Sequence, residues 1–227
     1  MILDLRQATL EHLIDVIFDA GPNAALEENE DANEPFDYRV DPARQVVLLT
    51  DLFRRSFTLT TRFPSEQIER GLWHIMGAEY FHAFTQHIWN PDVSRVDRVR
   101  LIESVYDLYD SVLARNPFED IDFRHPDRLP RRFQTIDYMA PDLLLEGAAF
   151  VRKDPADRQA IRNAFLATYS RMLHHPSPVA KYAALHGLGH LKHPLRSQVI
   201  ASYLERYPSL TPDQRGYAAR AARGNVL

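Results

Sequence analysis

Cysteine is absent from this chain of 227 residues, and glycine is scarce, with 8 residues in the whole sequence. Without cysteine the chain forms neither disulfide bonds nor thiolate metal sites. The scarcity of glycine fits helices joined by short turns better than a sheet protein with many tight hairpins. No apolar run approaches the roughly 18 residues that a membrane-spanning helix needs. These absences favour a helical protein without a membrane span.

The start of the sequence also lacks the features of a secretory leader. Acidic residues interrupt the apolar stretch of residues 1–20, and no basic segment with a small-residue cleavage site accompanies it. We therefore expect the protein to be cytoplasmic.

Lysine is rare too. Of the 27 basic residues, 3 are lysines and the others are arginines, against 31 Asp and Glu and a formal net charge of −4. Affinity for nucleic acid depends mainly on basic residues that contact phosphates, so this charge argues against nucleic acid as the partner. The excess of arginine has two explanations, a GC-rich genome that would indicate a bacterial source, or selection for bidentate contacts.

Apolar residues recur at helical spacing along nearly the whole chain, in a pattern that predicts about nine helices in a single all-α domain. In the first part the predicted helices cover about residues 9–20, 42–60, 66–89, 94–115 and 133–152. Pro141 is expected to kink the last of them. The acidic stretch 26–38 and the proline-rich stretch 116–132 lack the period and predict a loop and a connector. Residues 1–152 therefore form an irregular helical part.

From Asp154 onward the pattern becomes repetitive, with four short helices separated by linkers of a few residues. Each helix is entered through a proline at or near its first turn, where proline is well tolerated. Short helices in antiparallel pairs, repeated about every 35 to 40 residues, are typical of an α-solenoid. We expect this architecture over residues 153–227.

The segment 176–194 resembles the second helix of a HEAT repeat, which begins at a proline turn and closes on Leu-Gly-Leu. The matching residues are Pro178, Val179, Lys181, Ala183, Ala184, Leu188, Gly189 and Leu191. The resemblance extends over residues 155–224 and implies HEAT-like helical hairpins. Proteins of this kind are mostly scaffolds that bind another protein, and a bacterial immunity protein, an antitoxin-like inhibitor or an adaptor would fit.

Two groups of HEAT-like proteins are enzymes, and the sequence departs from both. The DNA glycosylases of this kind are basic, whereas this chain is acidic. The deoxyhypusine hydroxylases bind iron through paired His-Glu motifs, and no His-Glu dipeptide occurs here. The sequence therefore predicts no catalytic residue and no cofactor, and a protein as the partner.

Three histidines, His186, His190 and His193, lie at the end of the HEAT-like helix. On a helical wheel His186 and His190 share a face opposite the apolar face that points into the core. Packing against a neighbouring helix, a partner-binding surface and a transition-metal site are all compatible with this pattern. Gly187 and Gly189 each weaken the helix by on the order of 1 kcal/mol, which predicts a close approach of another helix at these positions.

A metal site would need ligands besides His186 and His190, and it would make a metal-dependent enzyme the alternative function. The candidates for those ligands are His174 or His175, and Glu79 with His82. Glu79 and His82 have the Glu-x-x-His spacing of di-iron bundles. A buried structural pair explains the same two residues, because an isolated buried carboxylate is very unfavourable.

Asp137, Asp142 and Glu146 lie along the fifth predicted helix, around Pro141. They predict either an acidic patch that faces a basic partner or an ordinary solvated face.

Overall fold

The computed structural model describes residues 2–19, 37–77, 84–115, 133, 135–146 and 154–226. These residues are almost entirely helical, which confirms the predicted all-α class. A short parallel pair of strands, β1 (Ile2–Asp4) and β2 (Asp37–Arg39), is an addition that the apolar pattern did not predict.

The helices of the first part are shorter and less regular than predicted. They are α1 (Leu10–Ile14), continued by the π-helical turn η1 (Asp15–Asp19), then α3 (Pro42–Arg54), α4 (Phe57–Arg62), α5 (Ser65–Met76), the 3-10 helix η2 (Phe84–Trp89), α6 (Arg95–Leu108), continued by the π-helical turn η3 (Tyr109–Leu113), and α7 (Ile136–Glu146). The predicted helix 42–60 is wrong in its continuity, since the backbone leaves the helical region at Arg55. The predicted helix 66–89 is also wrong, because α5 ends before Gly77, whose backbone is extended.

The last four helices occur where the sequence predicts them: α8 (Pro155–Met172), α9 (Pro178–His190), α10 (Arg196–Arg206) and α11 (Pro212–Arg223). The reason is local. Asp154, Ser177 and Thr211 each accept a hydrogen bond from a backbone N–H in the first turn, and each is followed by proline at the first helical position. Gly224 ends α11 in the left-handed region, with φ of 75°.

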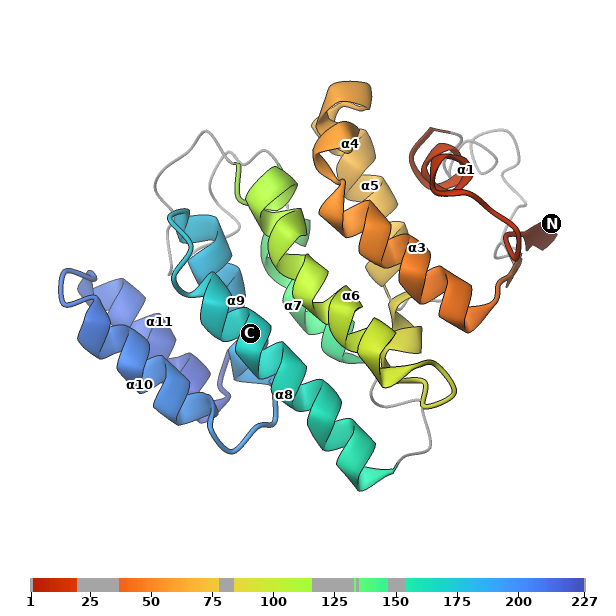
Figure 1. Cartoon of the computed structure of the whole chain (residues 1–227). Coiled ribbons are helices and arrows are strands. Elements are labelled where there is room, and N and C mark those ends of the chain that lie inside the picture. Colours follow the sequence, from red (N-terminus) through yellow and green to blue (C-terminus); the bar gives the residue numbers. More distant parts are fainter. Residues whose placement is uncertain are drawn as a thin grey trace, which may run out of the picture.

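Two rows of helices make up most of the molecule (Figure 1). In the view of Figure 1 the front row contains α3, α6, α8 and α10, and the row behind it contains α5, α7, α9 and α11. Neighbouring helices in the back row contact each other, as do α3, α6 and α8 in the front row. The rows are joined by contacts between α8 and α9 and between α10 and α11. None of the described helices combines the length and hydropathy needed to cross a membrane.

Helix α9 lies in the core, and every one of its residues from 182 to 189 is buried. A Cβ atom on Gly187 would lie 2.6 Å from Cβ of Pro141 on α7 and 2.7 Å from Cε2 of Tyr169 on α8. A Cβ atom on Gly189 would overlap the side chain of Val226. The predicted close approach of another helix is therefore confirmed at Gly187, whereas at Gly189 the neighbour is Val226, which follows the end of α11.

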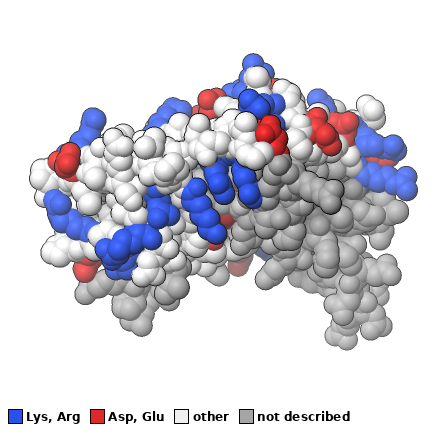
Figure 2. Space-filling view, turned by 90° about the horizontal axis from the view of Figure 1, so that it is seen from below, with Lys and Arg blue, Asp and Glu red and all other residues white. Residues whose placement is uncertain are grey.

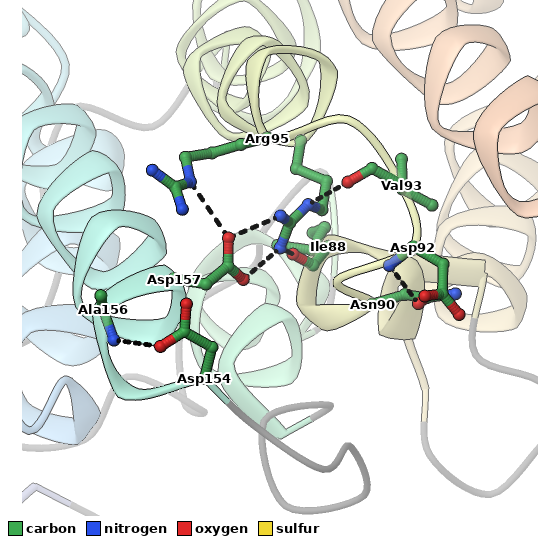
Figure 3. A network of polar contacts seen from close by, with 9 residues as sticks. Ile88, Asn90, Asp92, Val93, Arg95, Asp154, Ala156 and Asp157 are labelled. Carbon is green, nitrogen blue, oxygen red and sulfur yellow. Dashed lines mark hydrogen bonds and ion pairs between the residues drawn. The ribbon is translucent and has the colours of Figure 1, made fainter.

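A buried ion pair joins α6 to α8 (Figure 3). Arg98 is almost completely buried, and both of its terminal nitrogens donate to the Asp157 carboxylate at 2.8 Å. Its Nε donates to the carbonyl of Val93 at 3.0 Å. The hydrogen bond from Arg98 holds the pKa of Asp157 below its usual range. The front row is thus connected by a charged contact as well as by apolar packing.

Candidate functional site

His186 lies in the middle of the back row and is only 1% exposed. Its Nδ1 lies 3.0 Å from the hydroxyl oxygen of Tyr217 on α11, and the ring of Tyr138 on α7 packs edge-on against it at 5.6 Å. Its Nε2 is buried and has no hydrogen-bond partner among the residues that the structure describes. Of the explanations that the sequence leaves open for His186, packing against a neighbouring helix agrees with these contacts, because α7 and α11 both contact α9.

His190 follows one turn later, and its side chain is 34% exposed. Its Nδ1 lies 3.3 Å from Oδ1 of Asp142, a residue of α7 whose side chain is 16% exposed. The imidazole rings of His186 and His190 have centroids 4.8 Å apart. Asp142, His186 and His190 each offer one ligand atom, and these three atoms lie within 4.8 Å of one another. We call this group the Asp–His–His cluster.

Burial changes the protonation of the Asp–His–His cluster. It lowers the pKa of His186 to about 4, and the neighbouring His190 adds to this shift. His186 is therefore a neutral imidazole at pH 7. Burial also raises the pKa of Asp142, while His190 acts in the opposite direction. A neutral imidazole is the form of histidine that binds metal ions.

His193 is buried but does not belong to the cluster. Its Nδ1 accepts a hydrogen bond from the backbone N–H of Leu195 at 3.1 Å, so the proton of the neutral ring lies on Nε2. Nε2 then donates to Oδ1 of Asn163 on α8 at 2.9 Å. Burial, with a smaller contribution from Arg162, lowers the pKa of His193. These contacts give His193 a structural role in the turn between α9 and α10.

His174 and His175 lie in the turn that joins α8 to α9. Nδ1 of His175 accepts a hydrogen bond from the backbone N–H of Ser177, two residues later, as Nδ1 of His193 does from Leu195. Nε2 of His175 lies 3.1 Å from Oδ1 of Asp110. His174 contacts the hydroxyl of Tyr207 at 3.2 Å. Neither histidine joins His186, so the prediction that one of them is the extra ligand is wrong, and Asp142 is the third member of the cluster.

The predicted acidic patch on the fifth helix is not formed as expected. Asp137 is 1% exposed, so its carboxylate cannot face a partner. Asp142 is directed to His190. The side chain of Glu146, and the predicted pair Glu79 and His82, lie outside the described residues.

Asp142 and both histidines are candidates in the sequence, but the sequence does not place them together. Nothing in the spacing of residues shows that α7 packs against α9. Tyr217 was missed altogether, and the only signal for it was its position among small residues on the apolar face of the last helix.

Charge is distributed unevenly along the chain. Residues 154–227 contain 10 Lys and Arg against 4 Asp and Glu, which leaves 17 against 27 for residues 1–153. Of the four acids, Asp157 is already paired with Arg98. Figure 2 shows Lys and Arg gathered over the left half of the view, which contains α10 and α11, with few acidic residues among them. The helices α8 to α11 therefore present a cationic surface on an acidic protein.

No family model, no curated protein and no solved structure matches this chain. Function must therefore be inferred from the Asp–His–His cluster and from the distribution of charge.

Proposed function

We propose that this protein is a small α-solenoid of HEAT-like hairpins that binds another protein. The arrangement in Figure 1 supports the architecture, because successive helices from α6 onward alternate between the two rows. Five residues separate α8 from α9, and five residues separate each later pair. Such short connections favour antiparallel neighbours.

Specific contacts also support antiparallel hairpins. His193, just after the end of α9, contacts Asn163 in the first half of α8. Arg196, the first residue of α10, donates to the carbonyl of Ala222 near the end of α11 at 3.3 Å. In both pairs the end of one helix lies beside the first half of its neighbour.

The observation that carries the binding proposal is the cationic surface of α8 to α11. Three segments bring basic residues to the same end of these helices: the first half of α8, the turn after α9 and the end of α11. Arg158 and Arg162 lie in the first half of α8, close enough for their charges to repel, and Arg162 also acts on His193. Lys192 is exposed beside His193, and Arg223 is exposed at the end of α11. We call Arg158, Arg162, Lys192 and Arg223 the cationic edge.

The cationic edge fits an acidic surface of a protein partner. The sequence had instead suggested a basic partner, which would face an acidic patch on the fifth predicted helix. Complementary charge steers such encounters and selects the partner. A long polyanion such as duplex DNA fits less well, because residues 1–153 carry ten more acidic than basic residues and would repel it. An inhibitor or an adaptor would cover its partner with an edge of this kind.

The proposal is tested by capture of partners from the native lysate with matched charge-reversal variants. The test variant carries Lys192→Glu and Arg223→Glu. The control carries Arg54→Glu and Arg70→Glu, which are also exposed and change the net charge by the same amount. We expect wild type and control to retain one acidic protein after nuclease treatment, and the test variant to lose it.

Salt gives the second measurement. Raising the salt from about 0.1 M to about 1 M shortens the screening length from about 10 Å to about 3 Å, so the complex should dissociate. Equal retention by both variants, or binding indifferent to salt, contradicts the assignment of the cationic edge. Capture that disappears with nuclease identifies nucleic acid as the partner and contradicts protein binding.

A further inference from the structure

The Asp–His–His cluster has the composition of a metal site. Two imidazole groups and one carboxylate suit divalent zinc, iron, cobalt or nickel better than calcium or magnesium, which prefer oxygen ligands. We propose that Asp142, His186 and His190 bind one divalent transition-metal ion between α7 and α9. This site is independent of the cationic edge.

The distances within the cluster are close to those that a metal ion requires. Zinc binds nitrogen and oxygen ligands at about 2.0–2.1 Å, which places ligands in a tetrahedral site about 3.3–3.4 Å apart. Nδ1 of His190 and Oδ1 of Asp142 are already 3.3 Å apart. The three ligand atoms all lie within 4.8 Å of one another, so side-chain rotation can close the site around an ion.

The surroundings of His186 prepare it for this role. The Tyr217 hydroxyl holds Nδ1 at 3.0 Å, which fixes the ring and leaves Nε2 for a ligand. Metal-binding histidines typically have such a partner on the other ring nitrogen. Nε2 is buried and lacks a hydrogen-bond partner among the described residues, and a buried polar atom in that state is unfavourable.

An ion pair between His190 and Asp142 is the simplest alternative explanation of the cluster. The ion pair accounts for the positions of His190 and Asp142, but it leaves Nε2 of His186 without a hydrogen-bond partner among the described residues. A bound metal ion would accept a ligand atom from all three side chains. His190 is one-third exposed, so an ion can enter from the surface, and water can complete the coordination.

Gly187 explains how the carboxylate reaches the histidines. It stands between His186 and His190 in sequence, and its missing side chain lets Pro141 approach α9 closely. Asp142 follows Pro141 and is thereby brought to His190. The Leu-His-Gly-Leu-Gly-His sequence therefore combines two ligands with the space that the third ligand needs.

The test uses untagged, metal-stripped protein, because a histidine tag would itself bind the ions. Zn²⁺ is titrated by calorimetry, the bound metal is counted by elemental analysis after dialysis, and Co²⁺ reports coordination through its visible absorption. We expect about one ion per chain, a rise in Tm on addition of Zn²⁺, and Co²⁺ absorption of the four-coordinate type.

Four variants separate ligands from bystanders. Asp142→Asn and His190→Gln should each abolish stoichiometric binding while the circular dichroism of the folded protein is retained. Tyr217→Phe should weaken the affinity about 10–100-fold, as loss of a partner behind a ligand does. His174→Gln, an exposed histidine outside the cluster, should bind as wild type.

Two results would overturn the proposal. One is a folded wild-type protein that takes up no Zn²⁺ and shows no change in Tm. The other is retention of full affinity by both Asp142→Asn and His190→Gln, which would place the ion elsewhere.

Discussion

Residues 154–226 and the helices before them are built differently. The later region consists of four unbroken α-helices, three of which begin at a side-chain cap followed by proline. In the earlier region α1 and α6 pass into π-helical turns, and α3 is separated from α4 by two residues. Local signals therefore specify the helices of the later region, whereas the earlier helices depend more on their neighbours.

Polar contacts join the two regions. Arg98 on α6 pairs with Asp157 on α8, and Asp142 on α7 pairs with His190 on α9. Both rows of helices therefore have polar contacts at the boundary between the two regions.

The largest effect is expected from Arg98→Ala, which leaves Asp157 in a partly buried position without its main partner. Removal of one member of a buried ion pair destabilises a protein by about 3–5 kcal/mol. Arg95→Ala is the control, because Arg95 donates to the same carboxylate but its side chain is 53% exposed, and it should lose less than about 1 kcal/mol. Urea unfolding measures the free energy of unfolding of both variants. An equal decrease in the two variants would show that the boundary does not depend on the buried ion pair.

Acid should weaken the earlier region through His74 on α5. Burial lowers the pKa of His74 to about 4, whereas the same imidazole in the unfolded chain has a pKa near 6.5. Between these two pH values the imidazole is neutral in the folded protein and protonated in the unfolded chain. Stability is therefore lost as the pH falls from 6.5 towards 4, by about 3 kcal/mol for this residue. Unfolding free energies of wild type and His74→Leu are compared across this range. A difference between them that does not change with pH would contradict the burial of His74.

Gly187→Ala tests the approach of α7 to α9. The added methyl group would overlap Pro141 and Tyr169, and overpacking of this kind destabilises by about 1–3 kcal/mol, against a gain in helix propensity of about 1 kcal/mol. We expect net destabilisation in thermal or urea unfolding, together with weaker Zn²⁺ binding. A more stable variant would mean that the two helices are further apart.

Gly216→Ala provides the matched opposite case within α11. The nearest atom to an added Cβ is Nη1 of Arg220 at 4.0 Å, so the methyl group meets open space. Alanine in a helix interior is favoured over glycine by about 0.5–1 kcal/mol, and the variant should be more stable by that amount. A loss of stability in the same unfolding assay would show that this face of α11 is covered.

The sequence predicted the later helices well and the earlier ones less well, for identifiable reasons. Ser177 and Thr211 are N-caps that act within one turn, so they are visible in the sequence. The break at Arg55 has no proline or glycine to mark it. Gly77 could have indicated the end of α5, but the helical spacing of apolar residues after it favoured one helix that continues to about residue 89.

The candidate site was only partly predictable. The spacing of His186 and His190 identified them as a pair on one turn of the helix. Packing of His186 against another helix was one of the alternatives, but α7 and α11 are distant in the sequence, so the contact of His186 with Tyr217 could not be predicted. The opposite charge of the two regions was present in the sequence but was hidden by the net charge of the whole chain.

The helical class, the positions of the last four helices and the close packing at Gly187 and Gly189 follow from the amino-acid sequence alone, because caps, period and glycine act within a few residues. The tertiary structure decided which side chains meet. Asp142 joins His190 across 48 positions of the sequence, and Arg98 joins Asp157 across 59. Such pairs depend on which helices pack together, and that choice is made by the burial of apolar surface over the whole core.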